Sequence, residues 1–309
     1  MQLQQLSYFL AVAETRHFTR AAQAMHVAQP SLSQQIRALE KELGAELFHR
    51  ARGNITLTDA GNALLPLARR MTADAERARA EVQEVAGVRS GRVRLGATPS
   101  LCTGLLPQVL RAYHRRHPGI ALHIQEGGSR DLVGELASGG LDLALLILPL
   151  QSHDPALDTT ELLTEELVVA SAPHTPPPVE KPYLDIQDLR RHPLVMFRHG
   201  YDLREFTMAA CRAEGFEPSF AVEGGEMDAV LGMVEAGLGL AVLPSMVVPT
   251  HRPLRTTRFR PPGLRRTIGL AHRKDVAPPA AARELRSVLM EYLENADRAG
   301  TLPPGTSRA

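Results

Sequence analysis

Apolar residues at steps of three and four predict a series of helices in the first part of the chain. In Leu3–Ala13 they form one stripe that a helix would bury. A short second helix opens at Phe18, and Thr19 is its expected cap. A third helix again gathers its apolar residues on one face: Leu32, Ile36, Leu39 and Leu43. The pattern predicts a small three-helix core.

The opposite face of the third helix is polar. A turn of about 100° per residue places five residues there: Pro30, Ser33, Gln34, Arg37 and Lys41. Short donors and acceptors with one bidentate arginine suit the edges of bases in a major groove. A solvated helix would more often carry Glu/Lys pairs, which occur only at the far end, in EKELG. The face therefore predicts DNA reading, although a plain helical bundle remains the alternative for this pattern alone.

A hairpin and a long helix follow. The segment LFHRARGNITLT predicts strands at Leu47–Arg50 and Ile55–Thr58, with Arg50 and Arg52 at the tip, where they can reach phosphates or a minor groove. Thr58 is then the expected cap of a helix running to about Val88. Its apolar residues follow a heptad seam: Leu64, Ala68, Met71, Ala75, Ala78, Val82 and Val85. Such a seam is typical of two helices packed side by side, although a stripe feeding an intramolecular core is the alternative. Pro66 predicts a bend.

After the stretch GVRSGRV the pattern changes to strands that alternate with helices, which predicts parallel α/β layers. The expected strands are RVRLGA, IALHIQE, LDLALLIL and EELVVAS, and the expected helices are Leu105–Arg116 and Asp131–Ser138. The chain is expected to enter a second lobe near Leu163–Glu166, where further strands cover Pro193–Phe197 and Gly239–Leu243. It is expected to return near Thr267–Ala271 and to end with a helix over Pro279–Leu293.

These patterns together predict an α/β protein with five parts. They are a winged helix-turn-helix domain (1–58), a linker and dimerisation helix (59–88), a hinge (89–91), a two-lobe domain (92–296) and a flexible tail (297–309). Lobe I covers about 92–162 and 267–296, and lobe II covers about 163–266.

Several short motifs resemble one known family. FTRAA, AQPSLSQQI, LEKELGAELFHR and LTDAG occur in this order and closely resemble the N-terminal domain of the LysR-type transcriptional regulators. Further along, GATPSLCTGLLPQVL, GGLDLAL, EGFEP and VEAGLGLAVLPS resemble the effector-binding domain of the same family, which is itself similar to periplasmic solute-binding proteins. The resemblance covers the chain to about Leu293.

This resemblance implies a regulator that binds double-stranded promoter DNA as a homodimer assembling into a homotetramer. Its linker helix would dimerise and space two reading helices about one DNA turn apart. The predicted DNA-contacting residues are Thr19, Gln29, Pro30, Ser31, Ser33, Gln34, Arg37, Arg50 and Arg52. Two positions depart from the family pattern. Ala28 stands where a capping serine is usual, which costs about 1 kcal/mol, and Gln34 replaces a common arginine.

Three strand ends predict a ligand site, because ligands in open α/β sheets bind beyond the carboxyl ends of strands. They carry Thr98 and Ser100, then Ser129, then Arg198. These hydroxyls and one guanidinium suit a small anion, above all a carboxylate. Ser100 and Ser129 match pocket positions of the family, whereas Arg198 is inferred from its placement. Glu226 would favour a ligand with a hydrogen-bond donor. Helix capping is the alternative role for each serine, and a surface ion pair is the alternative for Arg198.

Composition narrows the function. The 35 basic and 34 acidic residues give a net charge of +1, so no global field attracts nucleic acid. The sequence contains no secretory signal, no apolar run of the roughly 18 residues that a membrane span needs, no metal-ligand spacing and no catalytic or cofactor motif. Cys102 and Cys211 fall in different predicted lobes and are not expected to form a disulfide. We therefore expect a cytoplasmic regulator that is not an enzyme and needs no cofactor. The alternative is a two-lobe binding protein or enzyme whose N-terminal bundle only dimerises.

Overall fold

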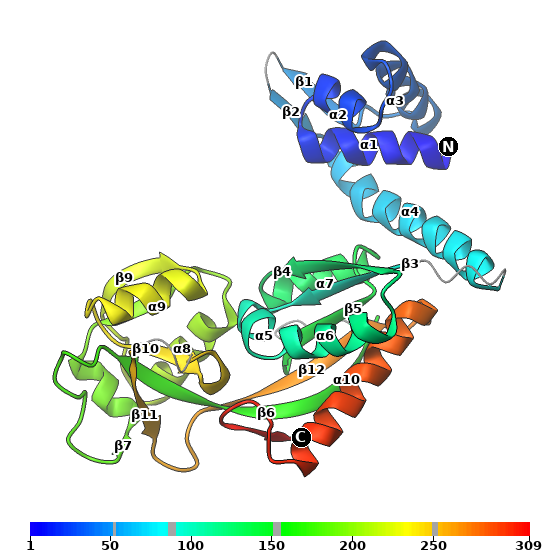
Figure 1. Cartoon of the computed structure of the whole chain (residues 1–309). Coiled ribbons are helices and arrows are strands. Elements are labelled where there is room, and N and C mark those ends of the chain that lie inside the picture. The colour runs from blue at the N-terminus through cyan, green and yellow to red at the C-terminus, as the bar shows by residue number, and fades with distance from the viewer. Residues whose placement is uncertain (52–53, 86–90, 151–155, 249–252) are drawn as a thin grey trace. The chain divides into compact units, whose positions relative to one another are not determined.

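Figure 1 shows the computed structural model of the chain, whose contacts form two compact units. The structure describes residues 1–51, 54–85, 91–150, 156–248 and 253–309. The N-terminal unit comprises Met1–Arg89 with Ala137–Gly140, and the C-terminal unit comprises Ser90–Leu136 with Leu141–Ala309. Each unit has a hydrophobic core of its own.

The N-terminal unit has the predicted order of helices and hairpin. Its described elements are α1 (Leu3–Thr15), α2 (Phe18–Ala24), α3 (Gln29–Leu43), β1 (Phe48–Ala51), β2 (Asn54–Leu57) and α4 (Asp59–Val85). The hairpin is antiparallel and pairs Phe48 with Leu57. Helix α3 ends at Gly44, whose φ of 72° lies in the left-handed region that glycine enters without strain.

The predicted apolar faces form the core of this unit. Leu32, Ile36 and Leu39 of α3 are fully buried, whereas Leu43, at the last position of that helix, is exposed. The ring of Phe48 lies 5.3 Å from that of Phe9 and so fixes the hairpin against α1. Side chains of α1, α3 and β1 therefore meet in one cluster.

The start of α2 differs from the prediction, whereas the start of α3 agrees with it. His17, and not Thr19, caps α2: its Nδ1 accepts a hydrogen bond of 3.2 Å from the Thr19 backbone N–H. The predicted cap was wrong because Thr19 already lies inside the helix, which begins at Phe18, so the capping position falls on His17 and an imidazole nitrogen accepts in place of a hydroxyl. Helix α3 begins after Ala28 without any side-chain cap, as the missing serine predicted.

Helix α4 begins as predicted, since the Thr58 hydroxyl accepts a hydrogen bond of 3.0 Å from the Gly61 N–H. It continues as α-helix through Pro66. The predicted seam has two parts. Leu64 and Ala68 pack into the N-terminal core, so the intramolecular alternative holds for the first turns. Farther along, Met71 is exposed, and Val82 is 70% exposed.

The C-terminal unit contains the remaining described elements. In chain order they are β3 (Gly91–Ala97), α5 (Pro99–Gly104), α6 (Leu106–Arg116), β4 (Ile120–Glu126), α7 (Ser129–Ala137), β5 (Leu143–Leu148), β6 (Leu157–Ser171), β7 (Tyr183–Leu184), η1 (Ile186–Arg191), β8 (Leu194–Phe197), α8 (Asp202–Ala213), β9 (Phe220–Gly225), α9 (Met227–Glu235), β10 (Ala241–Pro244), η2 (Ser245–Val247), β11 (Arg255–Phe259), β12 (Arg265–Arg273), α10 (Ala280–Arg298) and β13 (Thr306–Arg308). Lobe I is built on β3, β4 and β5, and lobe II on β7 to β11.

Strands β6 and β12 join the two lobes. They pair antiparallel from Arg265 opposite Glu166 to Arg273 opposite Leu157, and β6 continues into lobe II, where it pairs with β10 and β11. In Figure 1, β6 (green) runs from one lobe into the other. The predicted parallel arrangement holds for β3 with β4 and β5. It is wrong for the strand EELVVAS, which is part of β6, because β6 is antiparallel to β10, β11, β12 and β13.

The C-terminal segment is ordered, contrary to the predicted flexible tail. Strand β13 pairs antiparallel with β6, with Thr306 opposite Glu165 and Arg308 opposite Leu163. The Glu166 N–H donates to the Gly305 carbonyl at 2.9 Å, and the Ser245 hydroxyl of lobe II donates to the Pro304 carbonyl at 2.7 Å. The segment is ordered because β6 would otherwise have an open edge there, and the backbone N–H and C=O groups of that edge need hydrogen-bond partners.

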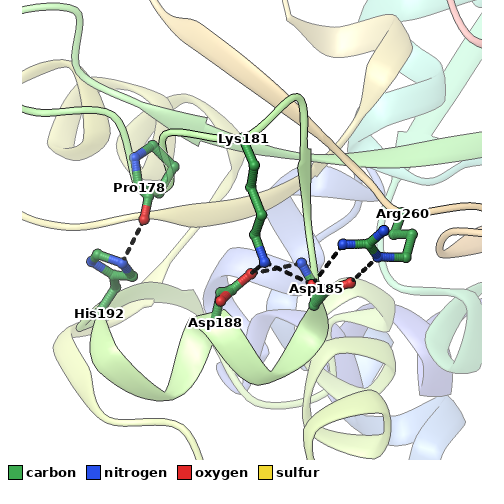
Figure 2. A network of polar contacts seen from close by, with 6 residues as sticks. All are labelled: Pro178, Lys181, Asp185, Asp188, His192 and Arg260. Carbon is green, nitrogen blue, oxygen red and sulfur yellow. Dashed lines mark hydrogen bonds and ion pairs between the residues drawn. The ribbon is translucent and has the colours of Figure 1, made fainter.

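A polar network in lobe II joins the segment 181–188 to Arg260. Figure 2 shows Lys181 between Asp185 and Asp188, and Arg260 on the Asp185 carboxylate. The hydrogen bonds from Arg260 and Lys181 hold the pKa of Asp185 well below its usual range. The Arg260 guanidinium is thus used within lobe II.

Candidate functional site

The outward face of α3 consists of polar side chains in contact with solvent. Ser33 is half-buried, and the other predicted contact residues of this helix are exposed: Gln29, Pro30, Ser31, Gln34 and Arg37. Leu32 and Ile36, on the inner face, anchor the helix and so fix the direction of the outer side chains. The helix therefore presents amides, hydroxyls and one guanidinium that can bond to a partner.

The hairpin positions differ from this face. The Arg50 guanidinium pairs with the Glu40 carboxylate, which is nearly buried, and it lies over the Phe18 ring at 5.5 Å. Glu40 also accepts a hydrogen bond of 3.0 Å from the Leu47 N–H. Arg50 thus holds β1 against α3 in addition to any contact with DNA. Thr19 is exposed at the start of α2, and Arg52 lies outside the described residues.

In lobe I, the predicted hydroxyls lie at the carboxyl end of β3 and are buried. Thr98 and Ser100 have their oxygens 3.4 Å apart. The Ser100 hydroxyl accepts a hydrogen bond of 2.9 Å from Nη2 of Arg266. Its partner is a side chain and not the backbone of its own helix, so helix capping does not describe Ser100.

Arg266 belongs to a buried ion pair on the two strands that join the lobes. Its Nε donates to Glu165 at 2.8 Å, and the two residues are opposite each other on β12 and β6. The other carboxylate oxygen of Glu165 accepts a hydrogen bond of 3.1 Å from the Met246 N–H of lobe II. Since Arg266 also holds Ser100 of lobe I, this pair connects both lobes. Arg266 was not among the predicted site residues.

Ser129, at the start of α7, also bonds across the lobes. Its hydroxyl donates to Oδ2 of Asp202 in lobe II at 2.8 Å, and its backbone N–H donates to the same oxygen at 3.2 Å. Next to it, Gly128 lies so close to lobe II that a Cβ there would come within 2.7 Å of the Gly200 carbonyl oxygen. Burial raises the pKa of Asp202. Sequence reasoning missed Asp202, and helix capping does not describe Ser129.

Arg198 and Glu226 bind each other. They follow β8 and β9, which are neighbours in lobe II, and their side chains are 37% and 54% exposed. The surface ion pair that was the alternative for Arg198 is thus present. The hydrogen bond from Glu226 raises the pKa of the Arg198 guanidinium.

Tyr201 is a further polar side chain between the lobes, and it was not among the predicted site residues. It is 3% exposed, and its ring stacks on Phe197 with centroids 4.6 Å apart. Its hydroxyl is buried without a hydrogen-bond partner in the described structure. Burial raises the pKa of Tyr201, and the charges of Arg266, Glu226, Glu126 and Asp202 act on the same group. We call this set the inter-lobe site: Thr98, Ser100, Ser129, Glu165, Tyr201, Asp202 and Arg266.

The cysteines and histidines form no further site in the described ranges. Cys102 and Cys211 are both free and lie on helices of different lobes, as expected. No group of three metal-binding side chains occurs among the residues that were searched. No helix in the same residues is long and apolar enough to cross a membrane.

Comparison with known proteins matches both units. The family model "Bacterial regulatory helix-turn-helix protein, lysR family" covers residues 3–62, and the model "LysR substrate binding domain" covers residues 86–294. The "Transcriptional dual regulator GltC" of Bacillus subtilis is 31% identical over 96% of this chain and 99% of its own length.

Two further relatives extend this match. A "Hydrogen peroxide-inducible genes activator" from Pectobacterium carotovorum is 30% identical over 95% of this chain and 97% of its own length. The structure of full-length CbnR complexed with its target DNA superimposes with a TM-score of 0.69 at 25% identity, covering 96% of this chain and all of the other.

Proposed function

Because the chain belongs to the LysR-type transcriptional regulators, we propose that it binds promoter DNA through α3 and the β1–β2 hairpin, and that a small carboxylate-bearing effector between the lobes alters this binding. The single observation that carries the DNA part is the solvent-facing row of Gln34, Arg37 and Ser33 above a fully buried apolar face. Such a row is suited to base edges. The protein would act in the cytoplasm, where the DNA is.

The active assembly on DNA is a dimer of dimers. Met71 and Val82 are exposed on α4, at positions of the heptad seam, and a second copy of the helix would cover them. The local surplus of positive charge on the N-terminal unit is small, so two reading helices are needed for useful affinity. The relative CbnR, whose structure contains its target DNA, supports this reading of the N-terminal unit.

Ser100 and Arg266 are the groups that we assign to the effector carboxylate, with Thr98, Ser129 and Glu226 around it. Arg266 is buried and already aims at the Ser100 hydroxyl. A carboxylate there would accept charge-assisted hydrogen bonds. Arg198 stays at the rim, because Glu226 holds its guanidinium.

Effector binding would reach the DNA through the joining strands. Arg266 connects Ser100 of lobe I to Glu165, and Glu165 connects to Met246 of lobe II. A ligand that changes the Ser100–Arg266 contact therefore changes how the lobes are held. Such differential binding is what couples an effector to a distant partner.

Peroxide sensing through a disulfide, which the name of one relative raises, receives no support from the thiols of this chain. Burial raises the pKa of the Cys102 thiol to about 12 and that of Cys211 to about 11. The thiolate is the reactive form, and raised pKa values deplete it at neutral pH. We therefore do not propose it.

Gel shifts with DNA from around its own gene test the DNA part. The expected result is sequence-selective binding that weakens steeply as salt rises, because phosphate contacts release counterions. Arg50→Ala should weaken binding to all sequences alike, whereas Ser33→Ala should relax the sequence preference. Binding without sequence preference would refute the proposed role of α3.

Thermal shifts with a panel of small carboxylates test the effector part. Ligands that bind the folded state raise the melting temperature. Ser100→Ala should remove the response, while Ser307→Ala, a hydroxyl on β13, should retain it. A panel without any stabilising carboxylate would refute this part and leave the DNA part standing.

A further inference from the structure

The cationic and donor groups between the lobes already hold carboxylates of the chain itself. The pairs are Arg266 with Glu165, Arg198 with Glu226, and the start of α7 at Ser129 with Asp202. Each pair brings one negative charge to one positive or donor group. A ligand that carries only negative charge would therefore add to a site whose cations are taken.

Glu126 also lies at the strand ends that carry the inter-lobe site. Its carboxylate has no ion-pair partner among the described residues. It is the last residue of β4 and lies opposite Ala97 of β3, the residue before Thr98. Partial burial raises the pKa of Glu126, and two carboxylates of lobe II, on Glu226 and Asp228, raise it further. Glu126 thus faces lobe II with surplus negative charge.

The Tyr201 hydroxyl is an independent sign of a ligand. It is buried without a hydrogen-bond partner among the described residues, and leaving such a group unpaired is unfavourable. The charges that act on it come from both lobes, from Glu126 on one side and from Glu226 and Asp202 on the other. The hydroxyl is therefore near enough to both Glu126 and Arg266 for their charges to act on it.

We propose that the effector is an amino-acid-like zwitterion whose ammonium group binds Glu126 while its carboxylate binds Ser100, Arg266 and the Tyr201 hydroxyl. This inference rests on the proposed effector function of the inter-lobe site. A zwitterion adds no net charge to a site that has already paired its cations. Its ammonium group gives Glu126 the missing cation, and its carboxylate gives the buried hydroxyl an acceptor.

Matched ligand pairs on the full-length protein test the proposal. Each protein amino acid is compared by calorimetry and thermal shift with the acid that lacks its amine, such as L-leucine with 4-methylpentanoate and L-glutamate with glutarate. At least one amino acid should bind about tenfold or more tightly than its deaminated partner, the size expected for one charged pair. Glu126→Gln should remove this preference and leave the deaminated acid unaffected.

Glu180→Gln is the matched control, because Glu180 is an exposed glutamate of lobe II away from the strand ends. It should keep the preference for the amine. Deaminated acids that bind as tightly as the amino acids would overturn this inference and leave the proposed carboxylate effector standing. The absence of binding by both members of every pair would overturn the proposed effector function and this inference with it. Tyr201→Phe should weaken amino acid and deaminated acid alike, since the hydroxyl is assigned to the carboxylate.

Discussion

The outward face of α3 and the inter-lobe site use polar side chains in opposite ways. On α3, Gln34 and Arg37 face solvent and leave their hydrogen-bonding capacity for a partner. Between the lobes, Ser100, Arg266 and Ser129 already bond to other residues of the chain. Exchanging the side chains of the first surface should leave the folded chain intact, whereas the second is part of what holds the two lobes together.

Under the proposed function, this difference would separate recognition from regulation within one chain. A face with free polar groups can bind DNA without reorganising, and its residues would then decide which sequence is chosen. A site whose groups are already paired responds to a ligand only by exchanging one set of bonds for another. Because these bonds join the lobes, the exchange alters their contact.

The largest contrast is expected for the buried ion pair. Arg266→Met leaves the Glu165 carboxylate buried without its cation and should lower the free energy of unfolding of the C-terminal unit by about 3–5 kcal/mol. Urea unfolding of the full chain measures it. Arg37→Met, on the exposed face of α3, is the control and should change stability by less than about 0.5 kcal/mol.

A second replacement sharpens this result. Glu165→Met added to Arg266→Met removes the orphaned charge and should recover a large part of the lost stability, as paired apolar replacements of buried ion pairs often do. Equal losses in the single and double variants would contradict the idea that the unpaired carboxylate is the cause.

Local periodicity was sufficient to predict the parts of the fold that depend on neighbouring residues. The apolar steps of α1 and α3, and the strand IALHIQE, gave elements whose ends differ from the structure by a few residues at most. The start of α4 was predicted as well, whereas its expected end near Val88 lies outside the described residues. The outer face of α3 followed from the same steps, because a helix that buries Leu32 and Ile36 must expose Gln34 and Arg37. The exposed candidate surface on α3 could therefore be predicted from the sequence.

The inter-lobe site could be predicted from the sequence only in part, because its hydrogen bonds and ion pairs join residues that are far apart in the chain. Ser129 and Asp202 are 73 residues apart, and Arg266 and Glu165 are 101 apart. No local pattern marks Asp202 as the partner of Ser129, and Tyr201 reads as one aromatic residue in a loop. The ordered C-terminal segment escaped prediction for the same reason, since PPGTSR is polar and its partner is the distant edge of β6.

Removing residues 303–309 should have the next largest effect. The truncation deletes bonds to β6 and η2, among them Glu166 N–H to the Gly305 carbonyl and Arg308 Nη1 to the Leu162 carbonyl. At about 0.5–1.5 kcal/mol for each net hydrogen bond, the C-terminal unit should lose about 2–4 kcal/mol. Chemical denaturation measures the loss.

Arg308→Ala, which keeps the strand, should cost about 1 kcal/mol and serves as the comparison. The truncated chain should also associate at high concentration, because an open strand edge is exposed. A truncated chain as stable as the full one would mean that β13 contributes nothing to the β6 edge.

Gln34→Ala tests the free face directly and should leave stability within about 0.5 kcal/mol of the parent. Its effect should be on choice of sequence, where the loss of one amide contact is worth about 1–3 kcal/mol of discrimination between bases. Competition binding among operators that differ at one base pair measures it. Gln23→Ala, an exposed glutamine on α2, is the matched control and should leave the ranking of operators unchanged.

The smallest effect, a pH dependence, concerns the Asp202 carboxylate that joins the lobes. Burial raises the pKa of Asp202, while the hydrogen bonds from Ser129 lower it. The folded chain therefore keeps this proton at a pH where the unfolded chain has released it, so the contribution of Asp202 to stability is complete in acid and declines as pH rises through the folded pKa.

Asp202→Asn retains an acceptor for Ser129 but does not titrate. Unfolding free energies measured across this range should favour the parent over the variant most strongly at low pH and less so above the folded pKa. Ser129→Ala should steepen the decline, because it removes a hydrogen bond to the charged form. A difference between parent and Asp202→Asn that stays constant with pH would mean that the Asp202 carboxylate is as well solvated in the folded chain as in the unfolded one, and that the lobes do not close over it.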